Sequence, residues 1–173
     1  TLERIGQSAF SGTNVTSVDF SNTALNGVES YAFSDCAITG DLSFPATLTH
    51  IGNGAFDAAT PSSIKLKSSN MVSLGGTDVF KAAKGTTCTV YVPKGLGETY
   101  KADTYWSPFR NNIEEYGYLV TVTQNNNYGM VSGGGAYEAG ETVTLTADPN
   151  NPSEYAAFGG WYENNQRISS DLV

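Results

Sequence analysis

A repeat of 23 residues in the first half of the chain constrains its fold more than any other feature. Two apolar columns recur at this spacing in one register: Leu2, Leu25, Leu48 and Met71, and then Ile5, Val28, Ile51 and Leu74. A third column comprises Phe10, Phe33, Phe56 and, one residue late, Phe80. A unit this short cannot bury its own hydrophobic side chains, so consecutive copies must stack and share one core. The repeat therefore predicts a solenoid of about four coils over residues 1–95.

Each copy continues into a short alternating segment that predicts a β-strand. The four segments are Val18-Asp19-Phe20, Leu42-Ser43-Phe44, Ile64-Lys65-Leu66 and Val90-Tyr91-Val92. In such a strand the outer two side chains point into the core and the middle one points to solvent. Because the copies stack in register, we expect short parallel strands. The glycines Gly6, Gly52 and Gly75 are predicted to form sharp corners with positive φ.

Composition and charge narrow the classes of partner. The 173 residues include 9 basic and 17 acidic side chains, a net charge of −8, with one histidine and two cysteines. The negative field disfavours nucleic acid and anionic membrane surfaces, and no run of 18 apolar residues predicts a membrane span. We expect no metal site and no cofactor, because nitrogen and sulfur ligands are scarce. The expected state is a monomeric fragment of a longer exported protein, with its signal peptide upstream.

No combination of side chains predicts a catalytic centre. His50 has no nearby cysteine, and the chain has no Gly-x-Ser-x-Gly elbow, so His50 is expected at the surface or in a hydrogen bond. Glu114 and Glu115 are adjacent in sequence, and if they lay on a strand their side chains would point to opposite sides, whereas a glycosidase needs facing carboxylates. Cys36 and Cys88 lie two coils apart, about 10 Å by strand spacing, which is beyond the reach of a disulfide. The chain is therefore predicted not to be an enzyme.

The repeated phrases resemble a known family. LERIGQSAFSG, VESYAFSDC and LTHIGNGAF, with the strand endings LSFP and VYVP, are similar to the BspA-like leucine-rich repeats of bacterial surface proteins. The stretch VPKGLGETYKADTYWSPF resembles the segment that closes such arrays, a short helix bearing Tyr100 followed by Trp106 and Phe109. The resemblance implies a leucine-rich-repeat solenoid over residues 1–116 whose terminal helical cap covers about 96–116.

Periodicity and charge both change near Gly117, which predicts a domain boundary there. Residues 1–116 hold 8 basic and 11 acidic side chains, whereas residues 117–173 hold 1 and 6. Segments 118–123 and 142–147 alternate apolar residues with threonine, as antiparallel strands do, with turns expected at 125–127 and 133–135.

The second half also resembles a known module. The phrases VSGGGAYEAGETVTLTADPN and FGGWYENNQRISSD are similar to the divergent internalin-type B repeat. The resemblance implies a small β-grasp-like antiparallel module over residues 117–173. The usual closing strand of that module is absent from the sequence, so we expect a truncated module here. Trp161 is expected in the core of this module, because large aromatic side chains dominate small cores.

These features predict a non-enzymatic cell-surface module for adhesion or protein recognition, with a host protein, matrix or other bacteria as partner. The alternative is a carbohydrate-binding or spacer arm of a larger exported protein. The predicted outward positions at the strand centres hold one aromatic residue, Tyr91, which favours a protein partner over a glycan. The candidate binding residues are Ser17, Asp19, Ser21, Asp41, Ser43, Ser63, Lys65, Lys67, Thr89 and Tyr91. Lys65 and Lys67 predict an acidic patch on the partner.

Overall fold

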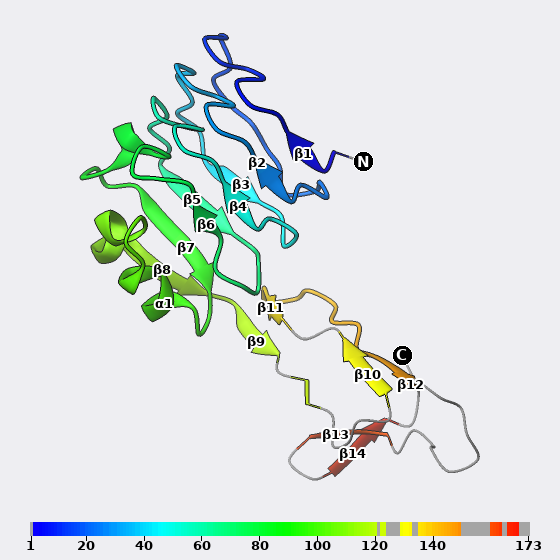
Figure 1. Cartoon of the computed structure of the whole chain (residues 1–173). Coiled ribbons are helices and arrows are strands. Elements are labelled where there is room, and N and C mark those ends of the chain that lie inside the picture. Colours follow the sequence, from blue (N-terminus) through cyan, green and yellow to red (C-terminus); the bar gives the residue numbers. More distant parts are fainter. Residues whose placement is uncertain are drawn as a thin grey trace. The chain divides into compact units, whose positions relative to one another are not determined.

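The computed structural model describes residues 2–120, 122–123, 129–132, 135–149, 160–163 and 166–169. Its contacts divide the chain into two units, residues 1–118 and 119–173. The first unit is a stack of coils whose strands form two parallel sheets (Figure 1). The described part of the chain is mainly β with few helices, as the sequence predicts.

The first sheet is built from the second apolar column of the repeat. It consists of β1 (Arg4–Ile5), β2 (Gly27–Val28), β4 (His50–Ile51) and β6 (Ser73–Leu74), in the order β1-β2-β4-β6. All its pairs are parallel, and Ile5, Val28, Ile51 and Leu74 are successive register partners. The 23-residue spacing is therefore the register in which the coils stack.

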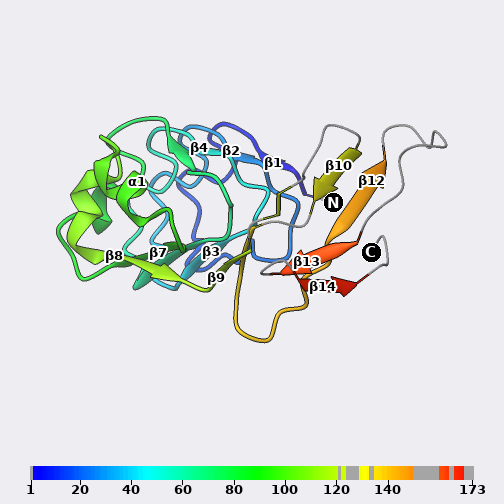
Figure 2. The same ribbon diagram turned by 90° about the horizontal axis from the view of Figure 1, so that it is seen from below.

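The second sheet lies on the opposite side of the coils (Figure 2). It consists of β3 (Leu42–Phe44), β5 (Ser63–Leu66), β7 (Thr89–Pro93) and β8 (Ile113–Tyr116), in the order β3-β5-β7-β8, with parallel pairing throughout. The predicted strand Val18–Phe20 is not a strand. Its segment joins the neighbouring coil through one backbone hydrogen bond, from Phe20 N to Ser43 O at 3.2 Å.

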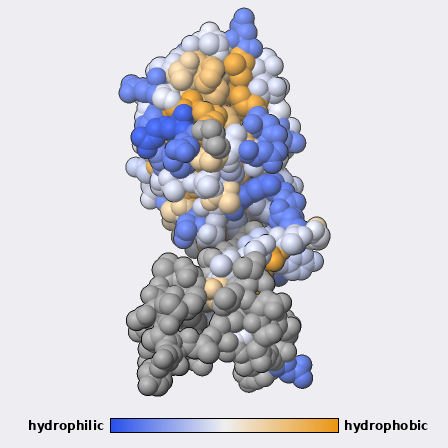
Figure 3. Space-filling view, turned by 90° about the vertical axis from the view of Figure 1, so that its right-hand side faces the viewer, coloured by the Kyte–Doolittle hydropathy of each residue, from blue (hydrophilic) through white to orange (hydrophobic). Residues whose placement is uncertain are grey.

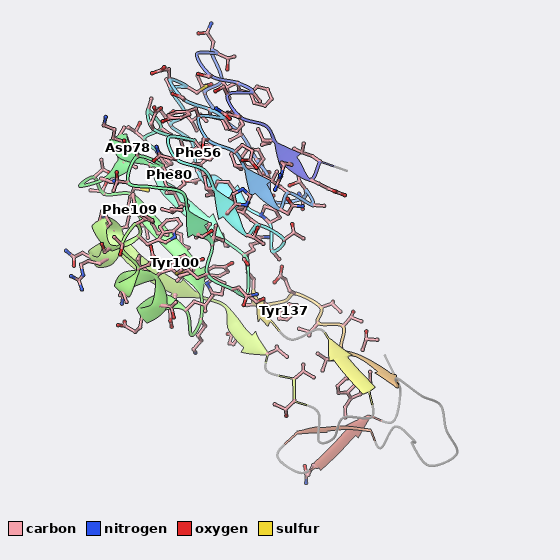
Figure 4. All side chains as sticks on the ribbon, viewed as in Figure 1. Phe56, Asp78, Phe80, Tyr100, Phe109 and Tyr137 are labelled. Carbon is pink, nitrogen blue, oxygen red and sulfur yellow. The ribbon has the colours of Figure 1, made fainter. Side chains whose placement is uncertain are left out.

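The core between the two sheets contains a ladder of aromatic rings. The rings of Phe10, Phe33, Phe56 and Phe80 stack in sequence, with centroids 5.0, 5.1 and 5.5 Å apart and planes within 12° of parallel. Figure 4 shows Phe56 and Phe80 inside the first unit, near Tyr100 and Phe109. The Phe10 side chain ends the ladder and is 42% exposed. Figure 3 shows exposed apolar surface among hydrophilic residues on one side of this unit.

The glycine prediction is wrong. In the first three copies positive φ occurs two residues further along the turn, at Ser8 (55°), Tyr31 (59°) and Gly54 (65°), and not at Gly6, Gly52 or Gly75. Gly52 has a different reason to lack a side chain, because a Cβ there would overlap the backbone nitrogen of Ser30 in the adjacent coil. A Cβ on Gly75 would lie 2.7 Å from the backbone nitrogen of Asn53. Close approach of consecutive coils, and not backbone conformation, therefore requires these two glycines.

The segment after the repeats packs against the last coil. It contains α1 (Gly97–Ala102) and a 3₁₀ helix, η2 (Ser107–Asn112), and an earlier 3₁₀ turn, η1, spans Lys81–Ala83. The side chains of Tyr100, Trp106 and Phe109 are buried. The Val72 N–H donates to Tyr100 Oη, and Trp106 Nε1–H donates to Val72 O, both at 2.8 Å. Side chains from beyond the repeats thus satisfy both backbone groups of one residue in the last coil.

The second unit consists of paired strands in the part that the structure describes. The strands are β9 (Tyr118–Val120), β10 (Gly129–Ser132), β11 (Gly135–Tyr137), β12 (Thr146–Pro149), β13 (Trp161–Glu163) and β14 (Gln166–Ser169). β9 pairs with β11, and the pairs β10–β12 and β13–β14 are antiparallel. Because these strands form three separate pairs, the β-grasp-like fold stays a prediction.

Two strand predictions in this unit need correction. The strand expected at 142–147 begins at Thr146, because its partner β10 has four residues and pairs with Thr146–Pro149. The strand expected at 118–123 is described as far as Val120. The predicted turn at 125–127 and residues 133–134 of the other lie outside the described residues, and Gly135 already belongs to β11. Trp161, the predicted core residue, is half-buried in β13.

Candidate recognition surface

The polar residues at the centres of the strands form a row across the outer face of the second sheet. Ser43, Lys65, Tyr91 and Glu114 are successive register partners in β3, β5, β7 and β8. The residues on either side of Ser43, Lys65 and Tyr91 in their strands are fully buried, so these three side chains point away from the core. Parallel strands lie roughly 4.8 Å apart, so side chains from different coils come within reach of a single ligand.

Two hollows adjoin on this face. The first, of about 300 Å³, is lined by Asp41, Leu42, Ser43, Ser63, Lys65, Tyr91 and Tyr116. The second, of about 500 Å³, is lined by Ser17, Val18, Asp19, Ser21, Gly40, Asp41 and Ser43. Asp41 and Ser43 line both hollows, so we treat the two together as the outer groove. Eight of the ten sequence-predicted residues line this groove, and Lys67 and Thr89 do not.

One end of the outer groove is aromatic and well fixed. The Lys65 ammonium lies 4.6 Å from the centroid of the Tyr116 ring, a cation–π geometry. Tyr116 Oη donates to Leu66 O at 2.9 Å, which anchors the ring to β5. The half-buried side chain of Tyr91 lies in the intervening strand β7. Two tyrosines therefore line this end, where the sequence predicts one.

The other end of the groove carries carboxylates. Ser63 Oγ donates to Asp41 Oδ1 at 2.8 Å, and Ser21 N donates to Asp19 Oδ1 at 2.9 Å. The backbone N–H of Ser21, then its hydroxyl, and the charge of Lys67 hold the pKa of Asp19 below its ordinary value. Asp19 is therefore ionised at neutral pH. Lys65 lies over Tyr116, and the charge of Lys67 acts on Asp19.

Sequence reasoning missed Tyr116 because β8 lies outside the repeats. The side chains of the adjacent residues Glu114 and Glu115 lie in different surroundings, and both residues are exposed. Glu114 is the register partner of Tyr91 on the outer face. Glu115 Oε1 accepts the N–H groups of Gly95 and Gly97, at 3.0 and 2.7 Å. The apolar Ile113, which aligns with a buried valine of β7, is the one signal that could have revealed this strand.

His50 lies on the first sheet, whereas the outer groove lies on the second sheet. Its Nε2 is 3.4 Å from Glu29 Oε1, and the same oxygen is 3.4 Å from Arg4 Nε. This geometry matches the expected surface or hydrogen-bonded histidine. The other ring nitrogen of His50, Nδ1, lies 3.5 Å from Thr49 Oγ1.

The two cysteines are free and buried. The Cys36 thiol donates to Phe10 O at 3.0 Å. Burial raises the pKa of the Cys88 thiol to about 11, and the Asp41 carboxylate contributes in the same direction. Cys88 is therefore a protonated thiol at neutral pH, and a protonated thiol is a poor nucleophile.

Two further features belong to the described residues. In that part of the chain, no group of three or more His, Cys, Asp or Glu side chains is close enough to hold a metal ion. None of the helices described there has the length and apolar character needed to cross a membrane.

Comparison with known proteins identifies the repeats. A family model described as the BspA-type leucine-rich-repeat region (six copies) matches residues 1–98. No curated protein and no solved structure matches the chain. The matched region ends before the second unit, so the internalin-type B repeat has no support from these comparisons. The matched residues make up more than half of the chain and supply seven of the eight strands in the two stacked sheets. The chain therefore belongs to the BspA-type leucine-rich-repeat family.

Proposed function

We propose that this chain is a non-enzymatic module that recognises a protein partner through the outer groove. Leucine-rich-repeat domains are generally non-catalytic, and the family suggests protein recognition or a surface role. The observation that carries the proposal is the groove itself, in which outward side chains from successive coils line one continuous surface. BspA-type proteins are typically exported or at the cell surface, so the proposed partner is a host protein, matrix or another bacterium.

The rigidity of the sheet supports this role. Each strand under the groove is held by fully buried neighbours, such as Leu42 and Phe44 in β3 and Ile64 and Leu66 in β5. A surface that is already ordered loses little conformational entropy on binding. Tyrosine is enriched among the residues that dominate binding energy, because it buries a large area with few rotatable bonds. Tyr91 is therefore the proposed anchor.

The rest of the chain completes this proposal. We propose that residues 96–116 are the terminal cap of the array, which is supported by the hydrogen bonds of Tyr100 and Trp106 to Val72. Residues 117–173 are proposed to be a separate B-repeat-type β module, and the protein is proposed to be an exported monomer.

The experiment is a binding assay with the full chain immobilised, probed with host matrix extract and with whole bacteria. We expect Tyr91→Ala to weaken capture about tenfold or more, as loss of an aromatic anchor does. The matched control is Tyr105→Ala, because Tyr105 is an exposed tyrosine outside the groove. Unchanged capture by a folded Tyr91→Ala variant contradicts the proposed site. Complete absence of capture by the wild type favours the alternative role as a spacer arm.

A further inference from the structure

The aromatic end of the outer groove has the chemistry of a small-ligand site. Its hollow of about 300 Å³ lies at the lower end of the range for ligand pockets. Aromatic, carboxylate, ammonium and hydroxyl groups converge there, on Tyr91, Tyr116, Asp41, Lys65, Ser43 and Ser63. We propose that this hollow is a subsite for one neutral pyranose ring of a saccharide. The inference rests on the proposed function, because it uses the same groove and names what the groove recognises.

Charge within the hollow favours a neutral ligand. The charged residues that line it are one carboxylate, Asp41, and one ammonium, Lys65, and each already has a neighbour inside the protein. Asp41 Oδ1 accepts the Ser63 hydroxyl at 2.8 Å, and Lys65 lies over the Tyr116 ring. The net charge of −8 also repels anions approaching from a distance. Sialylated and sulfated saccharides are therefore disfavoured relative to neutral ones.

The polar groups match the hydroxyls of a sugar ring. A sugar hydroxyl donates and accepts hydrogen bonds, so it can pair with an acceptor, a donor or another hydroxyl. Asp41 supplies an acceptor, Lys65 a donor, and Ser43 and Ser63 can serve as either. Since Ser43 and Lys65 are register partners in adjacent strands, roughly 4.8 Å apart, they are spaced to contact different hydroxyls of one ring.

The two tyrosines have different roles in the subsite. Tyr116 is fixed by its hydrogen bond to Leu66 O and positions the Lys65 ammonium. The half-buried side chain of Tyr91 lines the hollow, and in the proposed subsite its ring stacks on the apolar C–H face of the pyranose. The single aromatic residue that the sequence placed on this face argued against sugar binding. The proposed subsite takes a single pyranose ring and needs one stacking surface, Tyr91, since the Tyr116 ring already faces the Lys65 ammonium.

The test is an array of neutral, sialylated and sulfated oligosaccharides probed with the full chain, followed by calorimetric titration with the strongest neutral binder. We expect neutral oligosaccharides to bind in preference to acidic ones. Tyr91→Ala should weaken the affinity about tenfold or more, and Tyr91→Phe should retain it, since the ring and not the hydroxyl stacks. Asp41→Asn should weaken it several-fold, whereas Tyr105→Ala should leave it unchanged. Binding restricted to acidic saccharides, or no binding to any oligosaccharide, overturns the proposal.

A second experiment distinguishes the two possible sources of the saccharide. It also tests the saccharide subsite separately from protein recognition. Any matrix glycoprotein captured by the wild type is treated with glycosidases and measured again. Loss of capture places the pyranose on the glycoprotein, and capture of a free neutral polysaccharide of similar strength places it on a polymer. If the deglycosylated protein binds equally well and Tyr91→Ala still weakens it, the saccharide subsite is overturned while protein recognition stands. If Tyr91→Ala changes no binding at all, both proposals fall.

Discussion

Gly6 and Gly52 occupy equivalent positions of the repeat but have different surroundings. An added Cβ on Gly6 meets no atom within 4 Å, whereas one on Gly52 overlaps the backbone of Ser30. Gly52 has a coil on each side, and Gly6 belongs to the first coil of the stack. The same sequence motif thus carries a packing constraint at Gly52 that it does not carry in the first coil of this chain.

This difference gives a prediction with its own internal control. Gly52→Ala should lower the free energy of unfolding by about 1–3 kcal/mol, the usual cost of overpacking a closely packed site. Gly6→Ala should leave stability unchanged or raise it by about 0.4–1 kcal/mol, because alanine restricts the unfolded chain and meets no obstacle here. Urea unfolding followed by circular dichroism measures both. Equal effects of the two substitutions would mean that the coils do not approach each other as described.

At the scale of elements, the repeat register was predictable and β8 was not. The stacked columns place Ile5, Val28 and Ile51 opposite each other because each coil repeats the same apolar spacing. In β8 the residue paired with Val92 is Glu115, an acidic side chain at a position that is apolar in β7. The Glu115 carboxylate accepts hydrogen bonds from the N–H groups of Gly95 and Gly97. A contact between residues so far apart in the chain leaves no periodic signal in the sequence.

The same reasoning explains how much of the candidate site was predictable. Outward positions such as Ser43 and Lys65 follow from strict alternation, since their neighbours are committed to the core. Tyr116 reaches the groove by crossing from β8 to bond with Leu66 on β5, a contact set by sheet order. Local pattern therefore predicts which residues face outward, and tertiary arrangement decides which of them line one hollow.

Tyr100 links the segment after the repeats to the last coil, and its ionisation gives a pH-dependent prediction. Burial, the largest cause, raises the pKa of Tyr100 to about 12 from an ordinary value of 10.0. The stabilising contribution of the neutral phenol is fully present below pH 10. It decreases as pH rises from 10 towards 12, because the unfolded state loses its proton first.

We expect stability of the wild type to fall steeply between pH 10 and 12, and Tyr100→Phe to show a shallower fall over the same range. Near neutral pH, Tyr100→Phe should cost about 1–3 kcal/mol, since the buried Val72 N–H loses its acceptor. Thermal unfolding at stepped pH values measures both effects, and Tyr105→Phe is the exposed control. Parallel pH profiles for the wild type and Tyr100→Phe would show that Tyr100 titrates normally.

At the scale of the whole molecule, the first unit extends well beyond the repeats that define the family. The contacts assign residues 1–118 to it, whereas the family match ends at residue 98. The intervening residues supply α1, η2 and β8. They place Trp106 and Phe109 against Phe80, with ring centroids 5.9 and 6.4 Å from it, and they pair β8 with β7. This segment therefore covers apolar surface and a strand edge that the repeats alone leave open.

A pair of truncations tests this dependence. A chain of residues 1–118 keeps every one of these contacts, so it should unfold cooperatively with a midpoint close to that of the first unit in the full chain. A chain of residues 1–95 loses both hydrogen-bond partners of Val72, exposes Phe80 and leaves β7 as an edge strand. Each buried backbone group without a partner costs about 1–3 kcal/mol, and unfolding free energies of small domains are about 5–15 kcal/mol. The shorter chain should therefore be largely unfolded or aggregated. Cooperative unfolding of the 1–95 chain at the wild-type midpoint would show that the repeats are stable without the segment that follows them.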